Sequence, residues 1–130
     1  LKTDGIMLIH TIGSHYRKWE SSNCFIMKYI FPGGELPHLH NMTDNYTDKW
    51  LLEDFQNFGL SYMKTLNLWI KNINNWEGLE SYSLKFRRMW IYYLTLCSVT
   101  FKNRRHLLWQ FVYTKVNSNR PNDCHHIRKC

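Results

Sequence analysis

Three short apolar runs predict β-strands in this chain. The first covers residues 7–9 and ends at His10, and Gly13 predicts that the backbone turns away just beyond it. The second covers residues 50–55 and the third residues 106–114. Apolar runs of this length are typical of strands buried on both faces of a sheet. The pattern therefore predicts a sheet whose strands come from distant parts of the sequence.

The segments between these runs carry apolar residues at helical spacing. A short helix is predicted within residues 21–30, and Pro32-Gly33-Gly34 predicts its end. Residues 38–48 are rich in His, Asn, Asp and Thr and predict a loop. Two longer amphipathic helices follow, the first ended by Gly78 and the second capped by Ser83. Their apolar stripes are Tyr62, Leu66, Trp69, Ile73 and Trp76 in the first, and Phe86, Met89, Trp90, Tyr93, Cys97, Thr100 and Phe101 in the second.

The first run places His10 at the end of a strand. In open α/β sheets, ligands collect just beyond the carboxyl ends of parallel strands. A histidine there can donate or accept a hydrogen bond and can titrate near neutral pH. For a lone histidine, however, a hydrogen bond to a nearby carbonyl is the commoner explanation, so His10 alone does not define a site.

Composition narrows the class of protein. With 130 residues, 44% of them hydrophobic, the chain suits one domain with its own core. The aromatic content of 16% suits an apolar cavity as well as an ordinary core. No run approaches the ~20 apolar residues of a membrane-spanning helix, and no basic-then-apolar leader opens the sequence. The net charge of +7 favours an anionic partner, either nucleic acid or a membrane surface.

Nucleic-acid binding is the weaker of these two interpretations. The basic residues that would support it are Arg87, Arg88, Lys102, Arg104 and Arg105, near the aromatic residues Trp90, Tyr92 and Trp109. Stacking on bases needs exposed rings. These aromatics fall on a helix stripe or in a strand, so we expect them to be buried and expect no nucleic-acid partner.

The four cysteines show neither disulfide-like nor CxxC spacing, which favours reduced thiols in a cytosol. Residues 116–130 form a polar, basic tail that we expect to be disordered. Within that tail, Cys124, His125, His126 and Cys130 are metal-ligand types. Their spacing matches no zinc pattern, so we expect no metal site.

Five segments and the single residues between them, read in order, resemble the cyclopropane-fatty-acyl-phospholipid synthases, which are S-adenosylmethionine-dependent methyltransferases. Each motif alone is weak, but their order is specific. Gln56 replaces a histidine common in the family, and the loop at 38–49 is peculiar to this chain. The segments are LIHTIG at 8–13, KYIFPGGELP at 28–37, EDFQNFGLSY at 53–62 with Thr65, Leu66 and Trp69, FRRMWIYYL at 86–94 with Cys97 and Phe101, and WQFV at 109–112.

The resemblance implies an α/β fold. Residues 1–115 would form the C-terminal half of a class I (Rossmann-like) methyltransferase domain, with three strands and interleaved helices. The first half of that fold carries the glycine-rich turn that holds S-adenosylmethionine, and nothing here resembles that turn. We therefore expect this chain to be the C-terminal part of a longer enzyme, without cofactor-binding residues and inactive alone.

The resemblance also implies roles for five residues. Methyl transfer to a cis double bond leaves a carbocation, and ring closure then needs a base. In this family the base is taken to be a bound bicarbonate ion. It would be held by the His10 side chain, the Ile12 backbone N–H and the Tyr62 hydroxyl. Leu66 and Cys97 would line the acyl channel, although apolar helix positions are often only core.

The implied function is methylene transfer from S-adenosylmethionine to unsaturated phospholipid acyl chains. C-methylation of fatty or mycolic-type lipid chains by the same site stays open, as does a non-catalytic truncated partner subunit. We expect a cytoplasmic protein bound peripherally to anionic membranes. Whether the full-length protein forms a homodimer is left open.

Overall fold

A computed structural model describes residues 1–16, 24–44 and 48–118 of the chain. The cysteine and histidine residues of the predicted tail lie outside these ranges, so the prediction made for them is not addressed. Within the described ranges, the helices are too short or too polar to span a bilayer.

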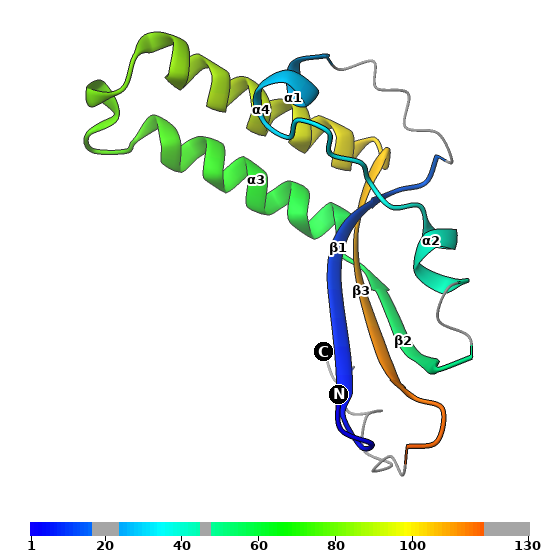
Figure 1. Ribbon diagram of the computed structural model, residues 1–130. Coiled ribbons are helices and arrows are strands. Elements are labelled where there is room, and N and C mark those ends of the chain that lie inside the picture. The colour runs from blue at the N-terminus through cyan, green and yellow to red at the C-terminus, as the bar shows by residue number, and fades with distance from the viewer. Residues whose placement is uncertain (17–23, 45–47, 119–130) are drawn as a thin grey trace.

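A three-stranded sheet forms the centre of the structure, in the order β1-β3-β2 (Figure 1). The strands are β1 (Ile6–Ser14), β2 (Trp50–Asn57) and β3 (His106–Lys115). The central β3 is antiparallel to both of its neighbours. β1 and β2 are therefore parallel to each other, with a reversed strand between them. The three strands and interleaved helices confirm the predicted α/β fold.

The first strand is longer than its apolar run predicted. It continues to Ser14, so His10 lies within β1, paired with Gln110, and not at the strand end. The prediction that the backbone turns away at Gly13 is also wrong. Gly13 stays in the strand, paired with Leu107, and a side chain at this position would overlap the ring of Trp109. Gly13 allows close packing against Trp109, and this role cannot be recognised from the sequence, where a glycine suggests a turn.

The two long helices are α3 (Gly59–Asn74) and α4 (Leu84–Lys102). As predicted, Ser83 caps α4, where its hydroxyl accepts a hydrogen bond from the Phe86 N–H at 3.2 Å. α3 ends before Trp76, which was predicted to continue its stripe and is instead 46% exposed. A single 3₁₀ turn, η1 (Leu79–Ser81), connects the two helices.

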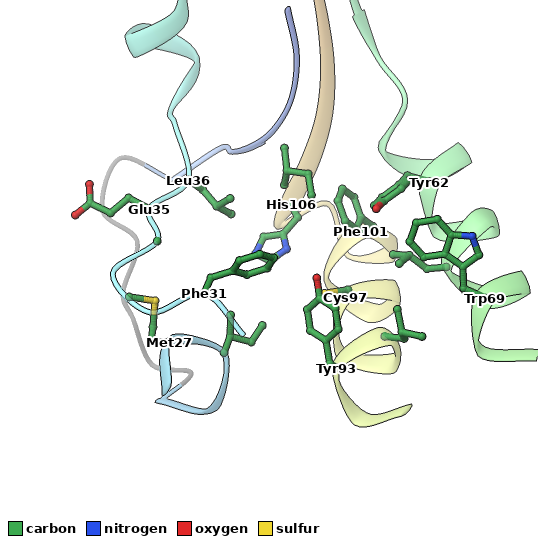
Figure 2. Close-up of a pocket in the computed structure, with 15 residues that line it drawn as sticks. Met27, Phe31, Glu35, Leu36, Tyr62, Trp69, Tyr93, Cys97, Phe101 and His106 are labelled. Atoms are coloured by element: carbon green, nitrogen blue, oxygen red, sulfur yellow. The ribbon is translucent and has the colours of Figure 1, made fainter. Parts of the chain in front are cut away.

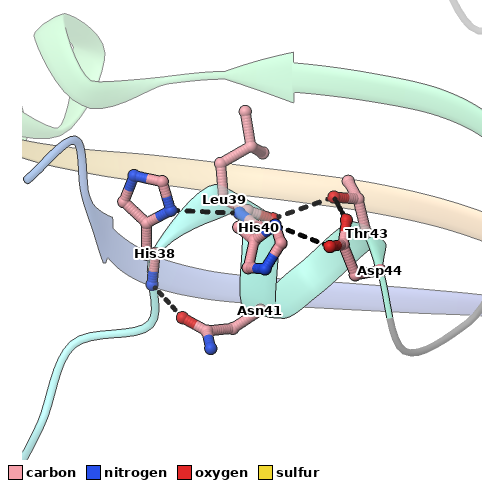
Figure 3. A network of polar contacts seen from close by, with 6 residues as sticks. All are labelled: His38, Leu39, His40, Asn41, Thr43 and Asp44. Atoms are coloured by element: carbon pink, nitrogen blue, oxygen red, sulfur yellow. Dashed lines mark hydrogen bonds and ion pairs between the residues drawn. The ribbon is translucent and has the colours of Figure 1, made fainter. Parts of the chain in front are cut away.

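Two short helices lie between β1 and β2. α1 (Cys24–Tyr29) falls within the predicted range, whereas α2 (Leu39–Thr43) lies in a segment predicted to be a loop. A reciprocal cap stabilises α2, as Figure 3 shows: the His38 N–H donates to the Asn41 side chain at 2.9 Å, and the His38 ring accepts from the His40 N–H at 3.2 Å. At its end, His40 and Asp44 form an ion pair. The polar residues that suggested a loop are therefore the caps of a helix.

The helices cover the sheet unequally. Figure 1 shows α3 and α4 as a hairpin that extends from one end of the sheet, with α1 against α4 and α2 beside the strands. The ring of Phe25 on α1 packs edge-on against Tyr92 on α4, and Tyr92 remains 52% exposed. The expectation that Tyr92 is buried is therefore wrong, whereas Trp109 is buried as predicted.

Alternate residues of β3 divide the buried apolar side chains into two clusters. On one face, Leu108 packs with the helical hairpin, in a cluster that includes Leu66 and Phe101. On the other face, Trp109 packs with Met42 of α2. The candidate site lies next to the first cluster, where the hairpin joins the sheet.

Candidate functional site

An apolar cavity of about 240 Å³ lies where the helical hairpin meets the end of the sheet, and we call it the inner cavity (Figure 2). Its wall combines residues of β1 and β3, of the helices α1, α3 and α4, and of the loop after α1. The wall comprises Ile12 of β1, Ile26 and Met27 of α1, Phe31, Gly34, Glu35 and Leu36 of the following loop, Tyr62, Leu66 and Trp69 of α3, Tyr93, Leu94, Cys97 and Phe101 of α4, and His106 of β3.

Helical periodicity explains why the two long helices present these side chains together. Tyr62, Leu66 and Trp69 are separated by four and three residues, so they share one face of α3. On α4, Tyr93 and Phe101 are eight residues apart, again on one face. The Tyr62 ring packs edge-on against Phe101, with ring centroids 5.0 Å apart, which fixes the helices at the cavity.

The structure brings most of the predicted site residues to this cavity. Ile12, Tyr62, Leu66 and Cys97 line it, whereas His10 does not. His10 and Ile12 are alternate residues of β1, so they share a face of the sheet but lie roughly 7 Å apart along the strand. The His10 Nδ1 is 3.0 Å from the Gln110 side-chain nitrogen. The roles predicted for these residues stay predictions.

Burial keeps the polar groups of the inner cavity neutral. Desolvation raises the pKa of the Tyr62 and Tyr93 hydroxyls. It also raises the pKa of the Cys97 thiol, although a hydrogen bond with Tyr93 acts in the opposite direction. For a histidine the effect is reversed, and burial lowers the pKa of His106 to about 4. The cavity therefore presents an uncharged wall, apart from Glu35 at its edge.

The Thr100 hydroxyl contacts both Cys97 and His106. Its oxygen lies 2.8 Å from the Cys97 carbonyl, to which it donates, and 3.0 Å from the His106 Nδ1. The hydroxyl therefore links α4 to the first residue of β3 beside the cavity. Sequence reasoning missed His106 because it reads as the first residue of a strand.

A second pocket, of about 480 Å³ and more open to solvent, adjoins the first between α3 and α4, and we call it the outer cavity. It shares part of its wall with the inner cavity, through Phe31, Trp69, Tyr93 and Leu94. The remainder of its wall includes Ile73 and Trp90. Together the two cavities form an apolar region along the hairpin, larger than the sequence predicted from Leu66 and Cys97 alone.

The residues described here do not fit a complete S-adenosylmethionine site. Such sites place a glycine-rich turn between a strand and a helix, so that backbone N–H groups face the ligand. The turn from β2 into α3 has Gly59, but the Asn57 side chain accepts from the Gly59 N–H at 3.0 Å. A Cβ at Gly59 would contact Asn57, Phe101 and Leu107, so the chain's own atoms fill this turn.

The predicted bicarbonate ion stays a prediction. Among the described residues, no lysine or arginine lines the inner cavity. A buried anion needs directed donors and a nearby cation. The Tyr62 hydroxyl lies at the cavity, but these residues alone do not form a complete bicarbonate site.

Comparison with known proteins identifies the class. The structure resembles that of the cyclopropane synthase MmaA2 from Mycobacterium tuberculosis, with a TM-score of 0.78 and 24% sequence identity, over 87% of this chain and 45% of that one. It also resembles the mycolic acid cyclopropane synthase CmaA1 complexed with SAH and CTAB, with a TM-score of 0.73 and 28% identity, over 87% of this chain and 45% of the CmaA1 chain. The fold is therefore part of the methyltransferase fold of these enzymes.

The family follows from the sequence comparisons. The model of the family "Mycolic acid cyclopropane synthetase" matches residues 1–111, so the chain belongs to this family of S-adenosylmethionine-dependent methyltransferases. The cyclopropane-fatty-acyl-phospholipid synthase of Escherichia coli K12 is 39% identical over 122 residues, which are 92% of this chain and 31% of that protein. The chain thus spans about a third of this relative. The resemblance noted in the sequence is confirmed.

Proposed function

We propose that this chain forms the acyl-chain-binding part of an enzyme that transfers a methylene group from S-adenosylmethionine to the cis double bond of unsaturated phospholipid acyl chains. The observation that carries the proposal is the inner cavity. Its wall is apolar and its titratable groups Tyr62, Tyr93, Cys97 and His106 are held neutral by burial. Such a wall favours a hydrocarbon chain over a polar or charged ligand.

The residues of this chain would contribute position and exclusion of water. A double bond is a weak nucleophile, so a close and directed approach to the reacting methyl group supplies much of the rate. A dry wall also protects a cationic intermediate from water. The ring face of Tyr62 is suited to stabilise positive charge. The parts that bind S-adenosylmethionine would come from the remainder of the enzyme.

Two alternatives share the same evidence. The same cavity suits C-methylation of fatty or mycolic-type lipid chains, because the products differ only in how the cation collapses. The second alternative is a non-catalytic partner subunit, because the residues described here do not form a complete S-adenosylmethionine site. In every case we propose peripheral binding to anionic membranes, supported by the net charge of +7.

A chimaera tests the proposal. Residues 1–115 would replace the matching C-terminal segment of the Escherichia coli synthase, and membrane fatty acids of cells lacking their own synthase would be analysed by gas chromatography. Cyclopropane acids should form, as with the intact relative, while the relative without its C-terminal segment should form none. Methyl-branched acids would favour the first alternative. A folded chimaera that binds S-adenosylmethionine but modifies no lipid would contradict the catalytic proposal.

Membrane association is tested separately, by flotation of the chimaera with liposomes. We expect binding to anionic vesicles that weakens as salt rises, because exposed charges are screened within about 10 Å at 0.1 M salt. Equal and salt-independent binding to zwitterionic vesicles would remove the electrostatic explanation.

A further inference from the structure

The two cavities of the hairpin are adjacent, and the inner one is small for a long acyl chain. Ligand pockets commonly measure roughly 300–1,000 Å³. The inner cavity, of about 240 Å³, is below this range, and the outer cavity measures about 480 Å³. A long acyl chain that fills the inner cavity can continue along the hairpin only past the shared wall, into the outer cavity, and otherwise stops at that wall or leaves into solvent.

Phe31 is the least firmly packed residue of that wall. Leu94 is 6% exposed, and Tyr93 is held by its hydrogen bond with Cys97. The Phe31 side chain, in contrast, is 55% exposed, and its ring approaches Tyr93 edge-on, with centroids 6.2 Å apart. In Figure 2 its ring points from the loop into the cavity, opposite Tyr93 and Cys97. An aromatic ring that is half exposed yet lines two cavities is suited to separate them.

The backbone holds Phe31 in place on both sides. Its own N–H donates to the Ile26 carbonyl at 2.9 Å, at the end of α1. Its carbonyl accepts from the Gly34 N–H at 3.0 Å, and Gly33 has a φ of 71°. Proline at the second position and a positive φ at the third are typical of a type II turn. Because this turn fixes the backbone, the ring can move only by rotation of its side chain.

We propose that Phe31 is a specificity-determining residue, which ends the inner cavity and so limits how much acyl chain the site accepts. The proposal rests on the proposed function, because it takes the ligand of the inner cavity to be an acyl chain. With the ring in place, added methylenes remain outside the apolar wall. Replacement of Phe31 by alanine joins the two cavities, so that added methylenes become buried in the outer one.

Chain-length dependence of binding tests this inference directly. The full 130-residue chain would be titrated with palmitoleate, oleate and the longer gondoate below their micellar concentrations, with a fluorescent fatty acid as the displaced probe. Each newly buried methylene strengthens binding about fourfold. We expect the wild-type affinity to change by less than about twofold from oleate to gondoate, and that of Phe31→Ala to rise roughly tenfold or more. Phe31→Leu should be intermediate.

Phe25→Ala is the matched control. Phe25 lies in the same segment and packs against Tyr29 and Tyr92, but it lines neither cavity. In this variant, as in wild type, the affinity should hardly change from oleate to gondoate. A brominated stearate, which quenches nearby tryptophan, supplies a second measurement. Trp90 lines only the outer cavity, and the part of the quenching that is due to Trp90 is found by comparison with Trp90→Phe. This part should be larger in Phe31→Ala than in wild type.

The outcomes separate this inference from the proposed function. Wild type could bind palmitoleate and oleate while the affinity of Phe31→Ala also hardly changes from oleate to gondoate. Phe31 then does not limit chain length, and the acyl-chain assignment stands. An equal rise in affinity from oleate to gondoate in Phe25→Ala would also overturn the role of Phe31, since the effect would then be a general loosening of α1. Failure of folded wild type to bind any of these fatty acids would overturn both.

Discussion

Gly13 lies where the ring of Trp109 crosses β1, and a Cβ at Gly13 would overlap that ring. In the register of the sheet, Trp109 is opposite Thr11 and Gly13 is opposite Leu107, so the two residues are diagonal neighbours on one face. Trp109 is 1% exposed and cannot move aside into solvent. The missing side chain at Gly13 is therefore what allows the strand to lie against the ring.

Gly13→Ala should consequently destabilise the protein. Overpacking of a filled interior typically costs about 1–3 kcal/mol. Urea denaturation would measure the change in the free energy of unfolding. The double variant Gly13→Ala with Trp109→Leu should lose less than the sum of the two single variants, because the smaller side chain relieves the overlap. A single Gly13→Ala effect within about 0.5 kcal/mol would show that the ring can shift at little cost.

The sequence predicted those elements whose pattern is local. The spacing of Tyr62, Leu66 and Trp69 reflects one face of α3, on which Leu66 is buried and Trp69 stays 46% exposed. Ser83 caps a helix as its side-chain chemistry predicts. By contrast, α2 depends on which polar side chains bond to which backbone groups, and composition alone suggested a loop. The extent of β1 depends on its pairing with β3, about a hundred residues later in the chain.

The candidate site was predicted only through family resemblance, because its residues meet through tertiary packing. No local pattern indicates that Ile12 of β1 and Cys97 of α4 line one cavity. His106 and Phe31 were missed for the same reason. Each belongs to a recognisable strand or turn, and its position at a cavity becomes visible only in the folded chain. His10 shows the converse, since its motif suggested the site while the structure places it along the strand.

Tyr62→Phe distinguishes a catalytic hydroxyl from a packing ring. If Tyr62 donates to a reacting anion, the variant in the active chimaera should lose about a hundred- to a thousandfold in turnover, with S-adenosylmethionine affinity nearly unchanged. His10→Ala should behave similarly. Ile12→Val keeps the backbone N–H and should retain near-normal turnover. If the Tyr62→Phe rate is unchanged, its ring contacts with Phe101 and Trp69 explain the residue sufficiently.

Cys97 should react slowly with iodoacetamide. It is a free thiol, 8% exposed, and burial raises its pKa, so little reactive thiolate forms. We expect alkylation in the folded protein to be at least about tenfold slower than in urea. Peptide mass mapping would separate Cys97 from the other cysteines.

Two comparisons test the cause of this protection. Tyr93→Phe removes the hydrogen bond that favours the thiolate, so the pKa of Cys97 should rise further and its alkylation should slow. Added oleate should slow alkylation in wild type if the chain occupies the inner cavity. Equal rates in folded and unfolded protein would show that the thiol is open to solvent.

His106 should make stability depend on pH between about 4 and 6.5. Burial lowers its pKa from 6.5 to about 4 in the folded protein, and the side chain is only 7% exposed. Between these values the unfolded state binds a proton that the folded state does not, so stability rises with pH through this window.

This contribution to the free energy of unfolding is complete above pH 6.5, and about 3 kcal/mol of it is lost as the pH falls to 4. His106→Leu removes the titrating imidazole, while the Thr100 hydroxyl can still donate to the Cys97 carbonyl. Urea denaturation across the window should show a steeper slope for wild type than for His106→Leu, while Leu108→Val should be about 1 kcal/mol less stable at every pH with the wild-type slope. Parallel curves for wild type and His106→Leu would mean that the buried imidazole titrates as it does in the unfolded chain.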